Sequence, residues 1–276
     1  MTGQPNSIFF PSSYPELFSL WNRHPEGILF AGGTGLLREQ GRQVFELPSV
    51  IFSLDTLEEL HRISRTERFL EIGAMVKINQ IIELGKTVPL VLRRCLESIA
   101  GPQLRNMATI GGNICFPGRR LDSSAALCAL DARFELRNDQ GTRWVSAPRF
   151  FASSETKLLH QQELLTRIRI PLDTWDYTSY RKFEGDAIRS RVVVFLAKIQ
   201  KNVLGDIKIV YKTDLIWRDR DSESLLIGKH LPLGRRIASD FIEHWQDYLS
   251  GIHNMEELSR QELVNFIETN VYNLSE

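Results

Sequence analysis

The sequence predicts an α+β fold in two parts, and two observations lead to this expectation. In the first part, short apolar runs bounded by turn residues predict strands, and helical stretches are grouped between them. Nearer the C-terminus, two predicted strands are followed by two amphipathic helices, a pattern typical of an α+β domain. A shift in composition between Pro171 and Thr178 separates the two parts.

The first part opens with strands. Residues 27–30 form an apolar run that leads directly into a glycine cluster, and residues 55–61 predict a short helix capped by its first residue, an aspartate. In a later helix, Val91, Cys95 and Ile99 share one face. The expected strands are 27–30, 50–54 and 69–74, and the expected helices are 78–84 and 88–99.

Glycine dominates the segment from 101 to 118, and we expect it to form loops rather than a helix. Residues 122–124 can cap the next helix, over 125–130. The turn at 138–141 predicts a hairpin. The strands expected around and after this turn are 134–136, 142–145 and 164–170.

The C-terminal part is predicted to contain strands 192–199 and 206–211, followed by a helix over 236–249. A second helix is expected to open with Ser259 and Glu262, which have capping-box spacing. We place the domain boundary near residue 175. The predicted domains are 1–175, with subdomains of about 1–55 and 56–175, and 176–276.

Composition excludes several classes of function. The chain has 34 lysines and arginines against 34 acidic residues, and its paired arginines are scattered, so it lacks the clustered positive charge that nucleic acid requires. No apolar run reaches the roughly 18 residues of a membrane span. The six histidines have no metal-binding or catalytic spacing, and motifs of classical nucleophiles are absent.

The cysteines indicate a reducing environment, and we expect a cytoplasmic protein. Cys95, Cys115 and Cys128 are odd in number and form no CxxC pair. Three thiols do not provide the four thiolates that usually hold an iron–sulfur cluster. Such a cluster would therefore have to come from another chain.

Two glycine-rich loops are the candidate ligand-binding motifs. Residues 31–35, AGGTG, follow a predicted strand, and residues 106–114, NMATIGGNI, again combine paired glycines with hydroxyl and amide side chains. Glycine lets the main chain approach a ligand closely, so that successive N–H groups can face phosphate oxygens. Either loop alone could instead be a tight turn or a close backbone crossing, but together they favour a ligand with two phosphates, such as a dinucleotide.

A family resemblance rests on these loops. Residues 31–37, AGGTGLL, resemble the AGGTDLL segment of the FAD-binding subunits of molybdenum hydroxylases, the xanthine and carbon monoxide dehydrogenase family. QLRN at 103–106 and ATIGGNI at 108–114 resemble the family's QIRN and TIGGNI segments. Further landmarks at 72–74, 163–171 and 180–182 follow in the family's order, so the resemblance covers nearly the whole chain.

The resemblance implies a fold of the p-cresol methylhydroxylase and vanillyl-alcohol oxidase type, in which two α+β subdomains clasp FAD and a C-terminal domain covers it. Both glycine segments would surround the pyrophosphate with main-chain donors. Asp122 would accept a hydrogen bond from the ribityl chain or ring, Ile99 and Leu165 would pack against the flavin, and Lys182 would stabilise its anionic reduced form. The implied FAD-binding residues are Leu29, Phe30, Ala31, Gly32, Gly33, Thr34, Gly35, Leu36, Ile99, Thr109, Ile110, Gly111, Gly112, Asn113, Asp122, Leu165 and Lys182.

The function implied by the resemblance is electron transfer. A molybdopterin subunit would oxidise the substrate, a [2Fe-2S] iron-sulfur subunit would relay the electrons, and FAD in this chain would pass them to NAD or another acceptor. Three features depart from the family pattern: Gly35 replaces an aspartate, residues 116–120 carry two arginines, and 185–191 lack an acidic segment. Two alternatives therefore stay open: a stand-alone flavin oxidoreductase, or a flavin-free scaffold or assembly protein that has kept the fold.

Overall fold

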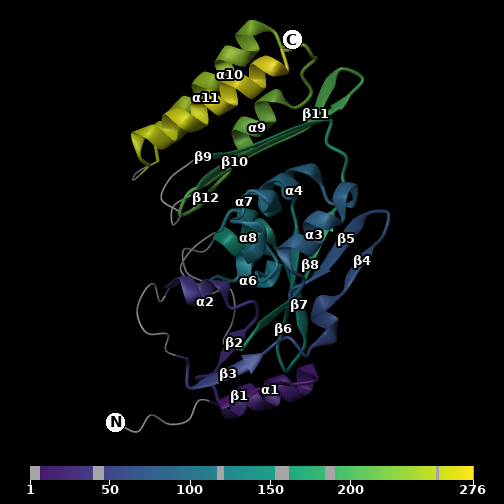
Figure 1. The fold of residues 1–276 in the computed structure, drawn as a ribbon. Coiled ribbons are helices and arrows are strands. Elements are labelled where there is room, and N and C mark those ends of the chain that lie inside the picture. Colours follow the sequence, from purple (N-terminus) through teal and green to yellow (C-terminus); the bar gives the residue numbers. More distant parts are fainter. Residues whose placement is uncertain are drawn as a thin grey trace.

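Three sheets and the helices between them make up an elongated molecule (Figure 1). The computed structural model describes residues 7–39, 47–116, 121–152, 162–183, 190–252 and 255–275. Helix α1 lies at one end of the molecule in Figure 1, and the pair α10 and α11 lies at the other. The three sheets follow one another along this axis.

The N-terminal sheet has three parallel strands in the order β1-β3-β2. Helix α1 covers it and buries Leu17 and Phe18, and Phe52 of the sheet is fully buried. Ser13 caps this helix by accepting a hydrogen bond from the N–H of Glu16. The elements are β1 (Ser7–Phe9), α1 (Tyr14–Arg23), β2 (Ile28–Phe30), α2 (Thr34–Glu39) and β3 (Val50–Ser53).

The second sheet has five antiparallel strands in the order β4-β5-β8-β6-β7. Its strands are β4 (Ile63–Arg65), β5 (Phe69–Gly73), β6 (Arg133–Arg137), β7 (Thr142–Ser146) and β8 (Leu164–Pro171). The accompanying helices are η1 (Glu58–His61), α3 (Ile78–Glu83), η2 (Gly85–Thr87), α4 (Leu90–Glu97), α5 (Pro102–Arg105), α6 (Ile110–Ile114), α7 (Ser123–Ala129) and α8 (Ala147–Ala152).

The third sheet has four antiparallel strands in the order β12-β11-β10-β9, and it separates two hydrophobic cores. Along β10, Val192 and Val194 pack into the core shared with the first two sheets, whereas Val193 and Phe195 pack under the C-terminal helices. The elements are β9 (Tyr177–Phe183), β10 (Arg191–Gln200), β11 (Val203–Lys212), β12 (Ile216–Trp217), α9 (Arg220–Leu226), α10 (Arg235–Ser250) and α11 (Glu257–Asn273).

Most predicted strands and helices are present, and three expectations were wrong in detail. The glycine-rich segment contains the short helices α5 and α6, because proline begins the first and Thr109 caps the second. The expected helix over 55–61 is a 3₁₀ helix that begins at Glu58. Helix α11 begins at Glu257, so Ser259 lies inside it, buried, and forms no capping box. Helices α1 and α9 and strand β9 were not predicted.

Candidate functional site

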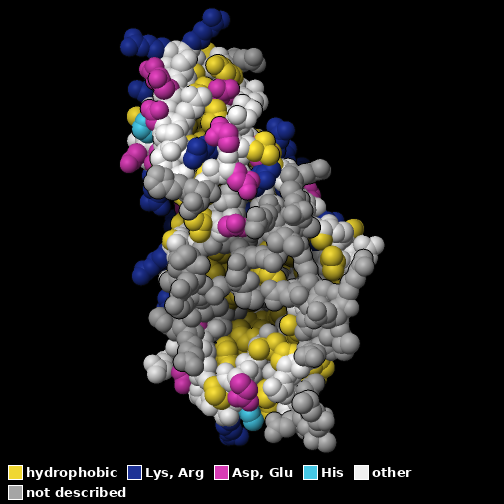
Figure 2. Space-filling model, turned by 90° about the vertical axis from the view of Figure 1, so that its left-hand side faces the viewer, with side chains coloured by type: hydrophobic (Ala, Val, Ile, Leu, Met, Phe, Trp, Pro, Cys, Tyr) yellow, Lys and Arg dark blue, Asp and Glu magenta, His cyan; other side chains and the backbone are white. Residues whose placement is uncertain are grey.

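A cavity of about 1010 Å³ lies in the middle of the molecule, where Figure 2 shows apolar side chains in a hollow. Its wall draws on segments that are far apart in the sequence. They are residues 27–36 with Trp21 and Leu54, residues 74–75, residues 99–100 with Leu104, residues 107–109, 111–113 and 115–116, residues 162–165 with Leu121, and Ser190 and Lys212.

The first glycine loop connects β2 to α2 at this wall. Gly33 has a φ of +69°, a left-handed conformation that favours glycine. A Cβ on Gly32 would lie 2.1 Å from the carbonyl oxygen of Met107, so the two glycine loops touch through their backbones. The main-chain N–H groups of Gly32 and Gly33 donate to no acceptor in the described part of the chain, and are therefore available to a ligand.

The second glycine loop forms helix α6, and its main-chain donors are already used. Ile110 N–H donates to the carbonyl of Val76 at 3.0 Å, and Gly111 N–H donates to that of Ala74 at 2.8 Å. The N–H groups of Gly112 and Asn113 donate to Thr109. The expectation that this loop offers main-chain donors to a pyrophosphate was therefore wrong for residues 110–113. What Gly112 offers is an exposed surface without a side chain.

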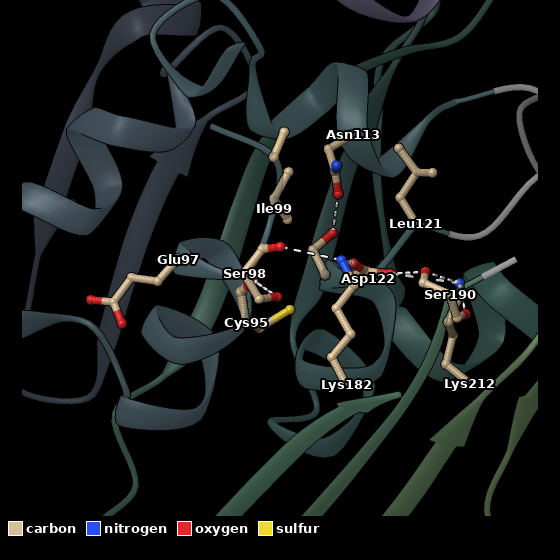
Figure 3. A network of polar contacts seen from close by, with 12 residues as sticks. Cys95, Glu97, Ser98, Ile99, Asn113, Leu121, Asp122, Lys182, Ser190 and Lys212 are labelled. Carbon is tan, nitrogen blue, oxygen red and sulfur yellow. Dashed lines mark hydrogen bonds and ion pairs between the residues drawn. The ribbon is translucent and has the colours of Figure 1, made fainter. Parts of the chain in front are cut away.

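Behind the cavity wall, Asp122 is bound from two sides (Figure 3). Lys182 Nζ lies 2.7 Å from one carboxylate oxygen and also donates to the carbonyl of Ser98 at 3.2 Å. The hydroxyl of Ser190 donates to the other oxygen. Burial raises the pKa of Asp122, but the hydrogen bonds from Lys182 and Ser190 outweigh it and hold this pKa below its ordinary value. Asp122 is therefore a fixed negative charge.

Lys212 joins this cluster from strand β11 and lines the cavity itself. Its ammonium donates to the carbonyl of Ser190 at 2.7 Å and to the Ser190 hydroxyl at 3.1 Å, and it lies 3.7 Å from Asp122. The side chain is 3% exposed. Burial lowers the pKa of Lys212, and the Asp122 carboxylate opposes that shift.

A tyrosine and a serine complete the surroundings of the cluster. The hydroxyls of Tyr180 and Ser98 are 2.7 Å apart, and Ser98 Oγ donates to the carbonyl of Cys95. Burial, followed by the neighbouring Cys95, raises the pKa of Tyr180, which keeps its phenol neutral. Ser123, which follows Asp122 in the sequence, donates a hydrogen bond to the amide oxygen of Asn113, and Asn113 lines the cavity. This contact connects the cluster to the cavity wall.

Comparison with known proteins identifies the family. A family model described as the FAD binding domain in molybdopterin dehydrogenase matches residues 4–173. The chain belongs to the family of FAD-binding medium subunits of molybdenum hydroxylases. It is 31% identical over 212 residues to the carbon monoxide dehydrogenase medium chain of Hydrogenophaga pseudoflava, a match covering 73% of this chain and 72% of that one.

Two further similarities extend over more of the chain. The nicotine 6-hydroxylase medium subunit of Paenarthrobacter nicotinovorans is 26% identical over 255 residues, covering 90% of this chain and 89% of the relative. Among solved structures, quinoline 2-oxidoreductase from Pseudomonas putida 86 superposes with a TM-score of 0.80 at 21% identity. That match covers 100% of this chain and 97% of the other, and it shows that the α+β fold is of the medium-subunit type.

The cavity of this medium subunit fits the FAD that its family binds. Its volume lies at the upper end of the roughly 300–1,000 Å³ range of small-molecule and cofactor sites, as a dinucleotide requires. The N–H groups of Gly32 and Gly33, which have no acceptor in the described segments, suit phosphate oxygens, and the buried Lys212 offers a cation elsewhere on the wall. The apolar side chains of Ile99 and Leu165 suit the faces of an aromatic ring.

Most residues predicted to contact FAD lie at the cavity, and three do not. Ile110 is buried in the hydrophobic core, while Asp122 and Lys182 lie behind the wall, bound to each other. The predicted residues that line the cavity are Leu29, Phe30, Ala31, Gly32, Gly33, Thr34, Gly35, Leu36, Ile99, Thr109, Gly111, Gly112, Asn113 and Leu165. Their contact with FAD remains a prediction.

Two wall residues that the sequence reasoning missed are Ser190 and Lys212. The only signal for Lys212 is its place in the apolar alternation of β11, where Val210 and Lys212 share a face and Val210 is buried. Glu163, which also lines the cavity, is neutralised by Arg143 through two contacts of 2.7 Å.

The structure links two departures from the family pattern. A Cβ on Gly35 would lie 2.4 Å from the ring of Phe116, so this ring occupies the space that a side chain at position 35 would need. Residues 117–120, and most of the 185–191 segment, lie outside the described part of the chain. Among the described residues, no helix is long and apolar enough to cross a bilayer, and no three His, Cys, Asp or Glu side chains cluster as metal ligands.

Proposed function

We propose that this chain binds FAD in the central cavity and transfers electrons within a molybdenum-hydroxylase-type dehydrogenase. It would accept electrons from a [2Fe-2S] subunit, while a molybdopterin subunit oxidises the substrate, and would pass them to NAD or another acceptor. The observation that carries the proposal is the large cavity between the two glycine loops, with N–H donors on one wall that have no acceptor among the described residues and a buried lysine on another.

FAD, when bound, supplies a ring that stores an electron pair and releases it to an acceptor. The chain's own residues would do the rest. Gly32, Gly33 and Thr34 would hold the phosphates by hydrogen bonds, and Gly112 would leave room for them. Ile99 and Leu165 would pack against the ring and exclude water. Asp122 and Ser190 would hold the Lys212 ammonium in place at the cavity wall.

We also propose that the chain has the two domains predicted from its sequence. Residues 1–175 would form two subdomains that clasp FAD in the p-cresol methylhydroxylase manner, and residues 176–276 would form the covering domain. In support, the family model ends at residue 173 and β9 begins at Tyr177. Ser190 and Lys212, which lie beyond the boundary, reach the same cavity as the glycine loops.

The substrate of the complex would be set by another subunit. The names of the relatives include a nicotine hydroxylase, a glyceraldehyde dehydrogenase, a carbon monoxide dehydrogenase and a caffeine dehydrogenase. Medium subunits similar to this chain therefore occur in complexes named for chemically unrelated substrates, and a cavity for FAD requires no substrate specificity of its own.

Purification of the chain through an affinity tag, from cells that make its complex, tests the proposal. We expect FAD in about equimolar amount, together with iron, acid-labile sulfide and molybdenum carried by co-purifying chains. Purified chain that neither contains nor takes up FAD would contradict the proposal and favour the flavin-free scaffold. A flavin that is reduced by substrate in the isolated chain would contradict it in favour of a stand-alone oxidoreductase.

A further inference from the structure

Two lysines and one valine form a row across the third sheet. Val192 of β10 pairs with Lys182 of β9 on one side and with Lys212 of β11 on the other. Residues in such a row point to the same face of a sheet, and Val192 packs into the core on the cavity side. Both lysines therefore project toward the first part of the chain, with their backbones roughly 10 Å apart. Asp122, at the start of α7, lies between the two ammonium groups.

The two lysines differ in what they face. Lys182 is 33% exposed, does not line the cavity, and is held by the Asp122 carboxylate and the Ser98 carbonyl. Lys212 is 3% exposed and lines the cavity. Its distance of 3.7 Å from Asp122 is longer than the 2.7 Å from Lys182, so Lys182 is the closer partner of that carboxylate.

Among the residues that the structure describes, two ammonium groups share the buried carboxylate of Asp122, and the Lys212 ammonium is the more deeply buried of the two. Asp214 also acts on Lys212, but it is exposed, and water screens it. Figure 3 shows Ile99 and Leu121 beside the cluster, and both line the cavity. The Lys212 ammonium thus borders an apolar part of the wall, which suits an aromatic ring better than a phosphate.

We propose that Lys212 is the cation that stabilises negative charge on the bound flavin ring, the role that the sequence alone assigned to Lys182. This inference rests on the proposed binding of FAD in the cavity. Lys182 is then a positioning residue, because it orients Asp122, which together with Ser190 holds Lys212 in place. A unit charge within several ångströms of the ring, in a site of low water content, changes the equilibrium constant for forming an anionic ring by a factor on the order of ten or more.

Sulfite provides a direct probe of this charge in the isolated chain. Its sulfur lone pair forms a bond to flavin N5, the ring takes the negative charge, and the absorbance near 450 nm is lost, without any other redox partner. We would titrate FAD-loaded wild type, Lys212→Gln, Lys212→Arg and Lys208→Gln, and measure the two-electron reduction potential of each. Gln retains an N–H donor, removes the charge, and has a side chain that is one bond shorter.

Lys208→Gln is the matched control. Lys208 lies on the same strand and face as Lys212, its side chain is 10% exposed, and its ion pair is with Asp131, outside the cavity wall. We expect Lys212→Gln to keep FAD but to bind sulfite at least roughly tenfold more weakly. Its two-electron reduction potential should be lower than that of wild type, by about 30 mV for each tenfold decrease in the equilibrium constant of reduction. Lys212→Arg and Lys208→Gln should remain close to wild type.

Each result decides between the two proposals. Yellow Lys212→Gln protein with the sulfite affinity and potential of wild type would overturn the role of Lys212 and leave FAD binding intact. Wild-type protein that takes up no FAD would overturn the proposed function and this inference with it. If Lys212→Gln does not fold, Lys212→Met replaces it, since it also removes the charge. A folded, yellow Lys212→Met with the sulfite affinity and potential of wild type would contradict the inference.

Discussion

At the scale of single residues, the cavity depends on side chains that are absent as much as on those that are present. Gly32 is required because the carbonyl of Met107 occupies the place of its Cβ, and Gly111 because Ala74 does the same. Gly112 differs, since its Cβ would meet only the Thr109 hydroxyl, at 3.0 Å, and its open side faces the cavity. The first two glycines hold the loops together, and the third leaves space for a ligand.

Gly112→Leu should therefore abolish FAD retention while the protein stays folded. The leucine side chain would extend into the cavity rather than into the core, so the expected loss of affinity exceeds about a hundredfold at little cost in stability. Gly234→Leu is a suitable control, because that glycine has open space around it and lies outside the cavity wall. Fluorescence titration with FAD measures the effect, and full occupancy in Gly112→Leu would contradict the assignment of the loop.

Asp122→Asn should destabilise the protein at neutral pH, because Lys182 and Lys212 would lose their shared counter-charge. Breaking a buried ion pair from one side costs about 3 kcal/mol. The hydrogen bonds that outweigh burial lower the pKa of Asp122 in the folded state. Its contribution is thus fully present above the unfolded pKa of about 4 and is lost as the pH falls through the lower folded value.

Melting temperatures measured from about pH 3 to pH 7 check this expectation. Wild type should lose stability on acidification more steeply than Asp122→Asn, so the two curves should converge at low pH. Glu16→Gln is the control, since the pKa of Glu16 is also lowered, by hydrogen bonds from Ser12, but the side chain is fully exposed. Parallel curves for wild type and Asp122→Asn would contradict the role given to Asp122.

At the scale of elements, the third sheet connects the cavity to the C-terminal helices. Val193, Phe195 and the fully buried Tyr211 pack against α10 and α11 on one face. Lys182 and Lys212 lie on the other face, where Lys212 lines the cavity and Lys182 binds Asp122. A bidentate ion pair connects strand β10 to helix α11, because Arg191 donates to both carboxylate oxygens of Glu262, at 2.7 and 2.9 Å. Because Arg191 follows Ser190 directly, this pair anchors the end of β10 that borders the cavity.

Glu262→Gln should lower the free energy of unfolding by roughly 1–3 kcal/mol, because a partly buried guanidinium would lose a two-point partner. Glu257→Gln on the same helix is the matched control. Its ion pair with Arg260 is 3.5 Å long, the Glu257 side chain is 70% exposed, and its loss should cost no more than about 0.5 kcal/mol. Urea denaturation distinguishes the two, and equal effects would contradict the anchoring role of Arg191.

At the scale of the whole molecule, the sequence predicts the elements and the glycine loops better than it predicts the cavity. Hydrophobic periodicity is local, so it located β3, β5 and α10 to within a few residues. The use of main-chain donors is not local. Ile110 and Gly111 donate to the segment that follows β5, and only the fold reveals that these groups are unavailable.

Lys212 could not be assigned from the sequence for the same reason. Its place at the cavity follows from the register of β9, β10 and β11, which aligns Lys182, Val192 and Lys212 across the sheet. Lys182, in contrast, belongs to a segment that resembles the family, which is why the sequence assigns to it the role that we propose for Lys212. Motifs thus identified the family, and tertiary pairing determined which lysine faces the cavity.

All predictions about the flavin depend on FAD binding in the cavity between the glycine loops. The most direct test is the absorbance spectrum of the purified chain from 300 to 550 nm, before and after addition of excess FAD and gel filtration. We expect flavin bands near 370 and 450 nm that survive gel filtration in wild type and are missing in Gly112→Leu. A folded wild-type chain that stays colourless after incubation with FAD would contradict this expectation.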